Sequence, residues 1–425
     1  AEAFITSVIK NEEERFIETL DTGLKLLNDT LSELKAGGKT EIPGKVIFKL
    51  YDTYGFPVDI VQDVVREDDY TLDMAGFETA MEGQRQQSRS KTTYTGISDA
   101  FTKLTASGFN PEFVGHSHLE AKSEILLLVT DGQQVESAGA DSDVEVVTER
   151  TPFYGEAGGQ VGDTGTISGQ DFSMQVVDTL KDATGLIIHR GKVTSGTIQT
   201  GASVQLLVDP KNRSAVERNH TATHILHAVL RAVLGEHVKQ AGSLVAADRL
   251  RFDFSHFSQV DRKTLNRIEE LVNDKIRENI ATQSEEMEAE DAFKSGAMAL
   301  FEEKYGDRVR VISLADFSKE LCGGTHVAKT GDIGLFKIIA ESSIASGVRR
   351  IEALTGKQAV RHIQSIGQLL HDTAHLIKEK PEALPGKVEK LLAESRLLEK
   401  EVDRLKAKVA TLSAAGAETE MKKIN

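Results

Sequence analysis

Four side chains that bind soft metal ions are grouped in two short segments that lie far apart in the sequence. The first segment, His220-Thr-Ala-Thr-His224, places two imidazoles at positions i and i+4, where they share one face of a helix. The second, Cys322-Gly-Gly-Thr-His326, contains a third imidazole and the only cysteine of the chain. Three imidazoles and a thiolate form a ligand set that suits tetrahedral Zn²⁺. The sequence therefore predicts a zinc site made by His220, His224, Cys322 and His326.

The chemistry of this site stays open on spacing alone. Thr221 occupies the position that glutamate holds in the His-Glu-x-x-His motif of metalloproteases, so the general base of a peptidase is missing. Four protein ligands would close the coordination sphere of a structural zinc, whereas a catalytic zinc keeps one position free. His227 lies one turn further along the same helix face. It is either a competing ligand or a partner that orients one of the ligands.

Polar side chains near the predicted zinc could orient a small substrate. Thr223 lies between the two helical ligands and places a hydroxyl near the metal. Gln240 and Ser243 follow the end of the predicted helix and add an amide and a second hydroxyl.

The bulk composition limits the class of protein. A chain of 425 residues predicts about two to four domains. A net charge of -15 argues against a surface covered with nucleic-acid-binding groups, although it allows a local basic groove. The lone cysteine fits a reducing compartment, and the sequence shows neither a signal peptide nor a run of roughly 18 apolar residues. We therefore expect a cytoplasmic protein without a membrane anchor. Because the chain begins without methionine, we expect it to be a piece of a longer one.

The hydrophobic patterns predict an α+β multidomain fold in four parts. Residues 1–90 form a helical domain, with an apolar stripe from Phe16 to Leu34 and two short helices at 46–51 and 58–65. A polar linker is expected at 82–95. Residues 91–207 form a small β-barrel or sandwich, because short β-rich runs alternate there with glycine turns. Those runs lie at 125–130, 144–148, 174–179, 186–189 and 204–208.

One glycine-rich segment interrupts the β-rich part. Residues 153–165 contain no Gly-Lys-Ser/Thr and do not fit the dinucleotide-binding spacing, so neither phosphate-binding motif is present. Composition alone favours a tight β-turn region.

Residues 208–357 predict an α+β core that carries the zinc ligands. Asp209-Pro210 is a typical helix start and opens the helix with the histidine pair. Further helices are expected at 265–280 and 289–301, and strands at 308–314, 334–340 and 348–354. Cys322 then lies in a glycine turn after the first of these strands.

Residues 358–425 predict two helices with apolar stripes, one ending near Ile377 and one running from Val388 to Leu412 as a heptad seam. Either a helical hairpin within the chain or an intermolecular coiled coil, and hence a homodimer, fits this pattern. We prefer the hairpin because the seam is short and is interrupted by Ser395.

A set of motifs resembles bacterial alanyl-tRNA synthetase, in the order found in that family. The motifs comprise the two zinc segments, the glycine-rich segment, Leu250–Phe254 and Gly347–Ile351. Residues 51–59 look like the later part of the family's tRNA-recognition domain. The resemblance covers nearly the whole chain, and the motifs are highly specific as a set.

This resemblance implies an editing module that hydrolyses the ester of tRNA(Ala) mischarged with serine or glycine. An alanine site rejects glycine only by a missing methyl group, about 10- to 200-fold, so a second hydrolytic site is a known remedy. The resemblance assigns catalytic roles to Cys322, Thr223 and Gln240, and substrate binding to Ser243. It also implies tRNA contacts, for which the candidates are Arg349 and Arg350 at the tRNA end and Asp52, with Asp59 as its rival, at the acceptor stem.

The resemblance also predicts what this piece lacks. The arginine-bearing motifs of a class II synthetase core are not found, so we expect deacylation without aminoacylation. The competing hypothesis is a tRNA-binding and assembly module with purely structural zinc. A free-standing editing protein is a third reading, against which the segment 51–59 argues.

Overall fold

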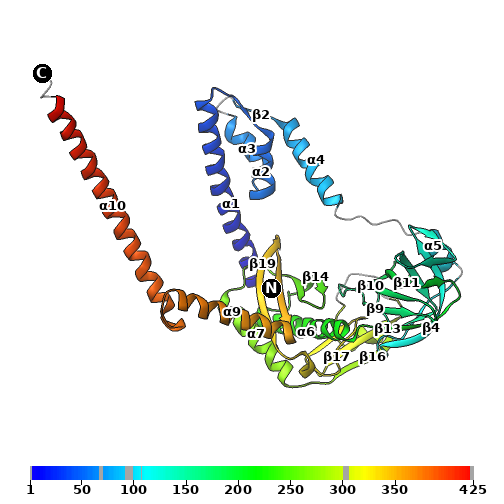
Figure 1. The fold of residues 1–425 in the computed structure, drawn as a ribbon. Helices are drawn as coiled ribbons and strands as arrows, with labels where there is room; N and C mark the ends of the chain where they lie inside the picture. Colours follow the sequence, from blue (N-terminus) through cyan, green and yellow to red (C-terminus); the bar gives the residue numbers. More distant parts are fainter. Residues whose placement is uncertain (1, 67–69, 91–98, 107, 300–305, 422–425) are drawn as a thin grey trace.

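The computed structural model describes residues 2–66, 70–90, 99–106, 108–299 and 306–421. Within these ranges, no helix combines the length and the apolar character that a bilayer crossing requires. The chain forms a group of N-terminal helices, a β-barrel, an α/β core and two C-terminal helices (Figure 1).

The N-terminal helices pack around one apolar core. They are α1 (Glu2–Ala36), α2 (Gly44–Tyr54), α3 (Val58–Val65) and α4 (Met74–Ser90), and a parallel pair, β1 (Glu41–Ile42) and β2 (Thr71–Leu72), lies between them. The leucine stripe of α1 is buried against α2 and α3, and Gly38 adopts φ 66° after the end of α1. The predicted helices are confirmed. The expected linker is wrong in part, because α4 continues to Ser90, and residues 91–95 lie outside the described ranges.

Six antiparallel strands close into the predicted barrel. They are β4 (Glu120–Thr130), β7 (Asp143–Thr148), β9 (Gly165–Ser168), β10 (Ser173–Lys181), β11 (Ile187–Ser195) and β13 (Ser203–Val208). Their order is β13-β9-β10-β11-β7-β4, and β13 also pairs with β4, so the sheet closes on itself. Short elements surround the barrel: α5 (Asp99–Ala106), β3 (Glu112–Phe113), β5 (Gln133–Gln134), β6 (Ser137–Gly139), β8 (Arg150–Thr151) and β12 (Thr197–Gln199).

The α/β core places two helices on a four-stranded antiparallel sheet. The sheet has the order β14 (Gln240–Val245), β15 (Leu250–Ser255), β20 (Val348–Thr355) and β19 (Phe336–Ala345). Helices α6 (Pro210–Leu234) and α7 (Arg262–Arg277) share one buried apolar cluster with this sheet. Asp209 caps α6 as predicted, because its carboxylate accepts hydrogen bonds from the backbone N–H groups of Lys211 and Asn212.

A second, three-stranded sheet carries the cysteine turn. It contains β16 (Thr282–Glu288), β17 (Arg308–Leu314) and β18 (Ser318–Leu321). The short helix η1 (Thr330–Ile333) follows β18 and precedes β19. The helix predicted at 289–301 is too long, since α8 spans only Ala289–Lys294, and residues 300–301 lie outside the described ranges. Strands β14, β15, β16 and β18 were not predicted.

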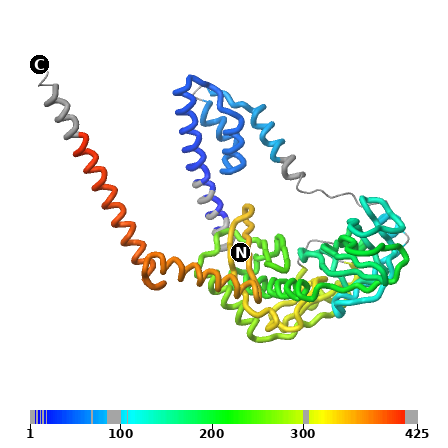
Figure 2. The backbone as a smooth tube through the Cα atoms, in the orientation of Figure 1, coloured from blue at the N-terminus to red at the C-terminus, as the bar shows by residue number. Residues whose placement is uncertain are grey.

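The C-terminal helices are separate rather than paired. Helix α9 (Gly356–Leu376) is followed by η2 (Pro381–Ala383) and α10 (Leu384–Met421). In Figure 2, α10 runs away from α9 and from the rest of the molecule. The hairpin that we preferred is therefore wrong for the described part of the chain. The apolar seams are left open to solvent, with Leu369 67% and Leu398 66% exposed.

Candidate metal centre and cavity

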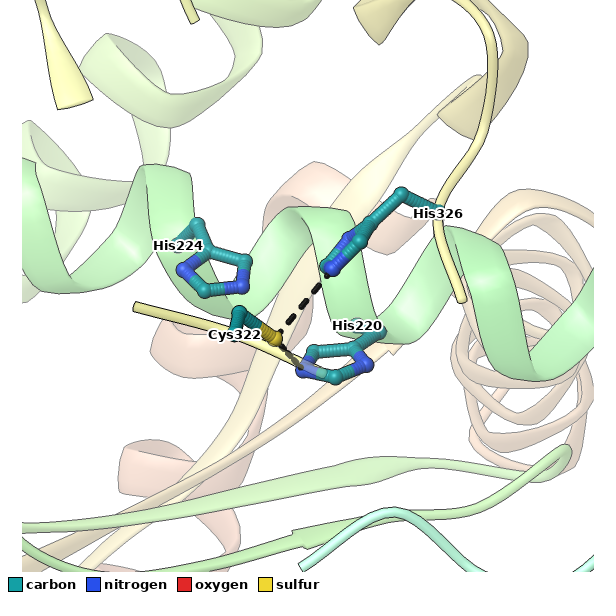
Figure 3. A group of neighbouring side chains, drawn as sticks. All are labelled: His220, His224, Cys322 and His326. Carbon is teal, nitrogen blue, oxygen red and sulfur yellow. Dashed lines mark hydrogen bonds between the residues drawn. The ribbon is translucent and has the colours of Figure 1, made fainter. Parts of the chain in front are cut away.

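The four predicted ligands converge on one point between α6 and the turn after β18. Figure 3 shows His220 and His224 on one helix, with Cys322 and His326 beside them. The candidate ligand atoms all lie within 4.8 Å of one another. The Sγ atom of Cys322 lies 3.4 Å from Nε2 of His220 and 3.3 Å from Nε2 of His326. The structure thus brings together every side chain of the predicted zinc set.

A neighbouring side chain of the same molecule fixes the orientation of each of the three imidazoles. The Nδ1 atom of His220 lies 2.6 Å from Oε1 of Gln160, and Nδ1 of His326 lies 3.2 Å from Oγ1 of Thr221. The Nδ1 atom of His224 is hydrogen-bonded to the buried carboxylate of Glu320. With Nδ1 occupied, each ring turns Nε2 toward the centre of the cluster, as in histidine ligands of metals.

The donor atoms fit a zinc ion. Among the described residues, Nε2 of His224 is buried and has no hydrogen-bond partner. Such an unpaired buried group costs free energy that coordination would recover. Three imidazole nitrogens and one thiolate sulfur are also the donors that zinc prefers. The predicted ligand set is therefore compatible with zinc in both geometry and chemistry.

Charged neighbours favour the thiolate at this site. Burial raises the pKa of the Cys322 thiol, but its electrostatic interactions with His220, His326 and His224 outweigh burial and lower that pKa well below its usual value. Burial likewise raises the pKa of Glu320, whereas its bonds with the imidazoles bring it to about 2. Both shifts favour the anionic form of the group, which suits a cation held by Cys322 and by His224, the partner of Glu320.

The turn that carries Cys322 is held by a side chain of β17 and approaches α6 closely. Arg310 of β17 donates from Nη1 to the carbonyl oxygens of Cys322, at 3.1 Å, and of Gly324, at 2.5 Å. A Cβ atom on Gly324 would lie 2.0 Å from Cε1 of His220, so only glycine fits at this position. A Cβ atom on Gly323, by contrast, would have no heavy atom within 4 Å.

Three of the four candidate ligands, His220, His224 and Cys322, form part of the wall of a cavity of about 790 Å³. Thr223, Gln240 and Ser243, which the sequence analysis singled out, line the same cavity. The hydroxyl of Thr223 donates to the carbonyl of Asn219 at 2.9 Å, so its oxygen lone pairs remain as acceptors. His227 also lines the cavity and lies 2.9 Å, through Nδ1, from Oε1 of Glu320. It is thus placed as an orienting neighbour rather than inside the ligand cluster.

The glycine-rich segment 153–165 joins the barrel to the core beside this cavity. Val161 donates to the carbonyl of Val245 at 3.1 Å, and Val245 donates back to Gly159 at 2.7 Å. Arg213 of α6 is fully buried and pairs with Asp163 of the same segment. The segment is therefore more than the tight turn that composition favoured, because it docks two parts of the fold and supplies Gln160.

The remaining predicted site residues lie away from the cavity. Arg349 and Arg350 are on β20, where Arg349 pairs with Glu341 and Arg350 makes two bonds to Asp253, at 2.7 and 2.8 Å. Neither arginine lines the cavity, so their contacts with tRNA stay predictions.

Both candidate acceptor-stem residues are exposed on the N-terminal helices and do not line the cavity. Asp52, on α2, accepts a hydrogen bond of 2.6 Å from Gln84. Asp59 lies in the first turn of α3. The structure does not distinguish between them.

Three residues of the site escaped the sequence analysis: Gln160, Arg310 and Glu320. Gln160 lies in a segment that was noted, but its partner His220 is distant in sequence. Glu320 precedes Cys322 by two positions, and that proximity was the only available signal. Arg310 belongs to no sequence motif that we noted. It binds backbone carbonyl groups, and such contacts leave no signal in the sequence.

Two parts of the chain match known families. Residues 1–212 match the class II (A) tRNA synthetases, and residues 309–352 match the second additional domain of threonyl and alanyl tRNA synthetases. Alanine--tRNA ligase of Desulfosudis oleivorans is 54% identical over 418 residues, which cover 98% of this chain and 48% of that protein. The corresponding ligase of Mesorhizobium japonicum is 45% identical over 436 residues, covering 99% of this chain and 49% of that protein. This chain thus spans about half the length of these relatives. It belongs, by these matches along nearly its whole length, to the alanyl-tRNA synthetase family.

Proposed function

We propose that this chain is an editing module, which hydrolyses the ester bond of tRNA(Ala) mischarged with serine or glycine. The observation that carries the proposal is the shared cavity, whose wall contains three of the four candidate metal ligands together with Thr223, Gln240 and Ser243. Membership of the alanyl-tRNA synthetase family supports the choice of tRNA. We place this activity in the cytoplasm, where the lone thiol would stay reduced.

In this proposal the chain's own residues bind and orient the mischarged aminoacyl group. The hydroxyl of Thr223 donates its proton to the backbone carbonyl of Asn219, so its oxygen lone pairs can accept a hydrogen bond from an ammonium or hydroxyl group. Gln240 can both donate and accept, and the hydroxyl of Ser243 adds another polar contact. A site that hydrogen-bonds a seryl hydroxyl leaves polar groups unpaired when alanine binds, which would favour the seryl ester over correctly charged tRNA. This contact does not apply to the glycyl ester, which has no hydroxyl.

His220, His224, Cys322 and His326 would hold zinc in this site. A bound zinc ion supplies positive charge that polarises a nearby oxygen atom and holds the cavity wall together. Gln160, Thr221 and Glu320 keep the three imidazoles in the required orientation. In this proposal Cys322 supports activity indirectly: as a zinc ligand, it maintains the shape of the cavity wall.

The test is release of serine from Ser-tRNA(Ala) by the zinc-loaded chain. We expect Cys322→Ala to lose zinc and serine release together. His371→Ala is the matched control, because His371 is exposed on α9 outside the cavity. Retention of zinc and of full deacylation by Cys322→Ala would refute the assignment of the site.

The second candidate function is a tRNA-binding and assembly module with purely structural zinc. It is favoured by the tight grouping of four protein donors, which fits a closed coordination sphere. Tight tRNA(Ala) binding without release of serine or glycine would support this function over editing. Under either function, the exposed apolar seam of α10 would form the interface of a homodimer. Sedimentation of the protein would detect this dimer.

The helical part and β20 would bind the tRNA itself in both functions. We propose acceptor-stem contact by Asp52 or Asp59, and contact with the tRNA end by Arg349 and Arg350. Comparing tRNA(Ala) binding by Asp52→Asn and Asp59→Asn decides between the aspartates. Arg350 is the more accessible of the two arginines, so Arg350→Ala should weaken binding more than Arg349→Ala if the contact exists.

A further inference from the structure

The imidazole of His227 has one nitrogen atom that the candidate metal centre does not use. The residue is 3% exposed and lines the cavity from α6. Its Nδ1 atom lies 2.9 Å from Oε1 of Glu320, whereas its Nε2 atom is buried and has no hydrogen-bond partner among the described residues. His227 also lies outside the cluster of four candidate metal ligands. An unpaired buried nitrogen costs free energy that a bound group with a matching hydrogen bond would recover.

Glu320 holds the ring of His227 in place. As an anion, the carboxylate of Glu320 only accepts hydrogen bonds, so Nδ1 of His227 carries the hydrogen. In the neutral ring, Nε2 then presents a lone pair. The other carboxylate oxygen of Glu320 binds Nδ1 of His224. One buried carboxylate thus orients both a candidate metal ligand and the ring of His227.

The fold places His227 beside the residues that the proposed function uses. Thr223 and His227 are at positions i and i+4, so they share one face of α6. Ser243 pairs with Phe252 across β14 and β15, so these two side chains lie on the same face of the sheet. The ring centroids of His227 and Phe252 are 5.3 Å apart. His227, Thr223 and Ser243 therefore bound the same part of the cavity.

A neutral hydroxyl group suits this position better than a charged group. A single unpaired nitrogen is present there, and the buried ring of Phe252 makes the flank apolar. A buried ammonium group requires several hydrogen bonds or a counter-charge, whereas a hydroxyl completes one bond by donating to Nε2. Of the two aminoacyl groups in the proposed function, serine has a side-chain hydroxyl and glycine has none.

We infer that His227 is a specificity-determining residue, which binds the side-chain hydroxyl of the seryl group through Nε2. This inference rests on the proposed function, because it places the aminoacyl group of that reaction between α6 and β14. The contact distinguishes the seryl ester from the glycyl ester. Glu320 acts on this contact as a positioning residue, because it holds Nδ1 of the same ring.

Two amide variants separate the roles of the two nitrogens of His227. The amide of asparagine can replace Nδ1 and keep the bond with Glu320, whereas the longer glutamine can place its amide where Nε2 lies. His227→Asn should lower the ratio of kcat/KM for serine release to kcat/KM for glycine release about 5- to 150-fold, the cost of an unpaired buried polar group. His227→Gln should keep a larger share of the serine preference. His371→Asn is the matched control, because His371 is exposed on α9 outside the cavity.

Zinc content distinguishes a substrate contact from a purely structural role. If His227 served only to hold Glu320, His227→Asn would keep the wild-type ratio of serine to glycine release. His227→Gln would then lose zinc and release of both amino acids together. That pair of results would overturn the inference while editing stands.

Binding assays separate failure of this inference from failure of the proposed function. The probes are tRNA(Ala) molecules that carry serine or glycine through a stable amide in place of the ester, with binding measured by equilibrium dialysis. If the wild-type protein releases no serine, editing fails. The inference still stands if the seryl probe binds more tightly than the glycyl probe and His227→Asn removes that difference. Equal binding of the two probes to the wild-type protein would overturn it.

A spectroscopic measurement on the wild-type protein decides the question even if neither variant folds. In protein with isotopically labelled histidine, the seryl probe should shift the Nε2 resonance of a histidine that the glycyl probe does not shift. The absence of such a shift would overturn the inference.

Discussion

Replacement of Gly324 by alanine is the sharpest test of how the metal centre is built. A Cβ at this position would lie 2.0 Å from Cε1 of His220, 2.4 Å from its Nδ1 and 2.7 Å from Oε1 of Gln160. All three distances are below van der Waals contact, so the imidazole or the turn must move. Because Gln160 sets the orientation of the His220 ring, the same methyl group also breaks the bond that holds it.

The expected effect follows from that displacement. Loss of a partner that orients a ligand typically lowers metal affinity about 10- to 100-fold. That factor corresponds to about 1.4–2.7 kcal/mol of binding free energy. Overpacking of a buried contact adds about 1–3 kcal/mol to the cost in the folded state. We therefore expect Gly324→Ala to bind zinc at least about 10-fold more weakly and to unfold at lower urea concentration.

The assay is competition for zinc between the protein and a chromophoric chelator, together with urea unfolding of the zinc-free protein. Gly323→Ala is the matched control, because a Cβ there meets nothing within 4 Å and the φ angle of Gly323 is not positive. It should retain wild-type zinc affinity within about threefold. Equal zinc affinity of the two variants would show that the turn does not approach His220 as described.

Three further predictions concern buried polar groups. Glu320→Gln removes the carboxylate that orients His224, and we expect about 10- to 100-fold weaker zinc binding in the chelator assay; unchanged affinity would exclude this role. Burial lowers the pKa of His189 to about 4 from 6.5, so below pH 6.5 the unfolded chain takes up a proton that the folded barrel does not. The unfolding free energy should therefore fall by up to about 3 kcal/mol between pH 7 and pH 4, and urea unfolding of His189→Gln should show a smaller fall; an equal fall would contradict this origin. Arg213→Met leaves Asp163 buried without its cation and should cost about 3–5 kcal/mol in urea unfolding, part of which Asp163→Asn should restore.

The sequence predicted features that depend on local periodicity. The i, i+4 spacing of His220 and His224 places both on one helix face, and the alternation in 204–208 places every second side chain inside the barrel. Asp209 caps α6 for an equally local reason, since its carboxylate reaches the N–H groups of the next turn. Such features can be predicted from the sequence because the residues involved are close neighbours in the chain.

Features that depend on distant partners were not predictable. Nothing near Gln160 in the chain indicates that its amide contacts His220, and nothing near Arg349 indicates that Glu341 neutralises it. Strand β14 was missed because it contains polar residues and glycine, and it is stabilised by pairing with β15 and with the glycine-rich segment. The heptad seam of α10 specified a helix with an apolar face, but it did not specify which surface that face contacts.

The glycine-rich segment couples ligand orientation to the docking of the barrel. Gln160 orients His220, Asp163 pairs with Arg213 two turns earlier on α6, and Val161 extends the pairing of β14. Movement of the barrel relative to the core must therefore disturb a histidine ligand and the cavity wall at the same time. Zinc, bound as we propose, would stabilise the arrangement in which all these contacts are made, because a ligand that binds only one state favours that state. The barrel and the four candidate metal ligands are thus coupled through the glycine-rich segment, which contacts both.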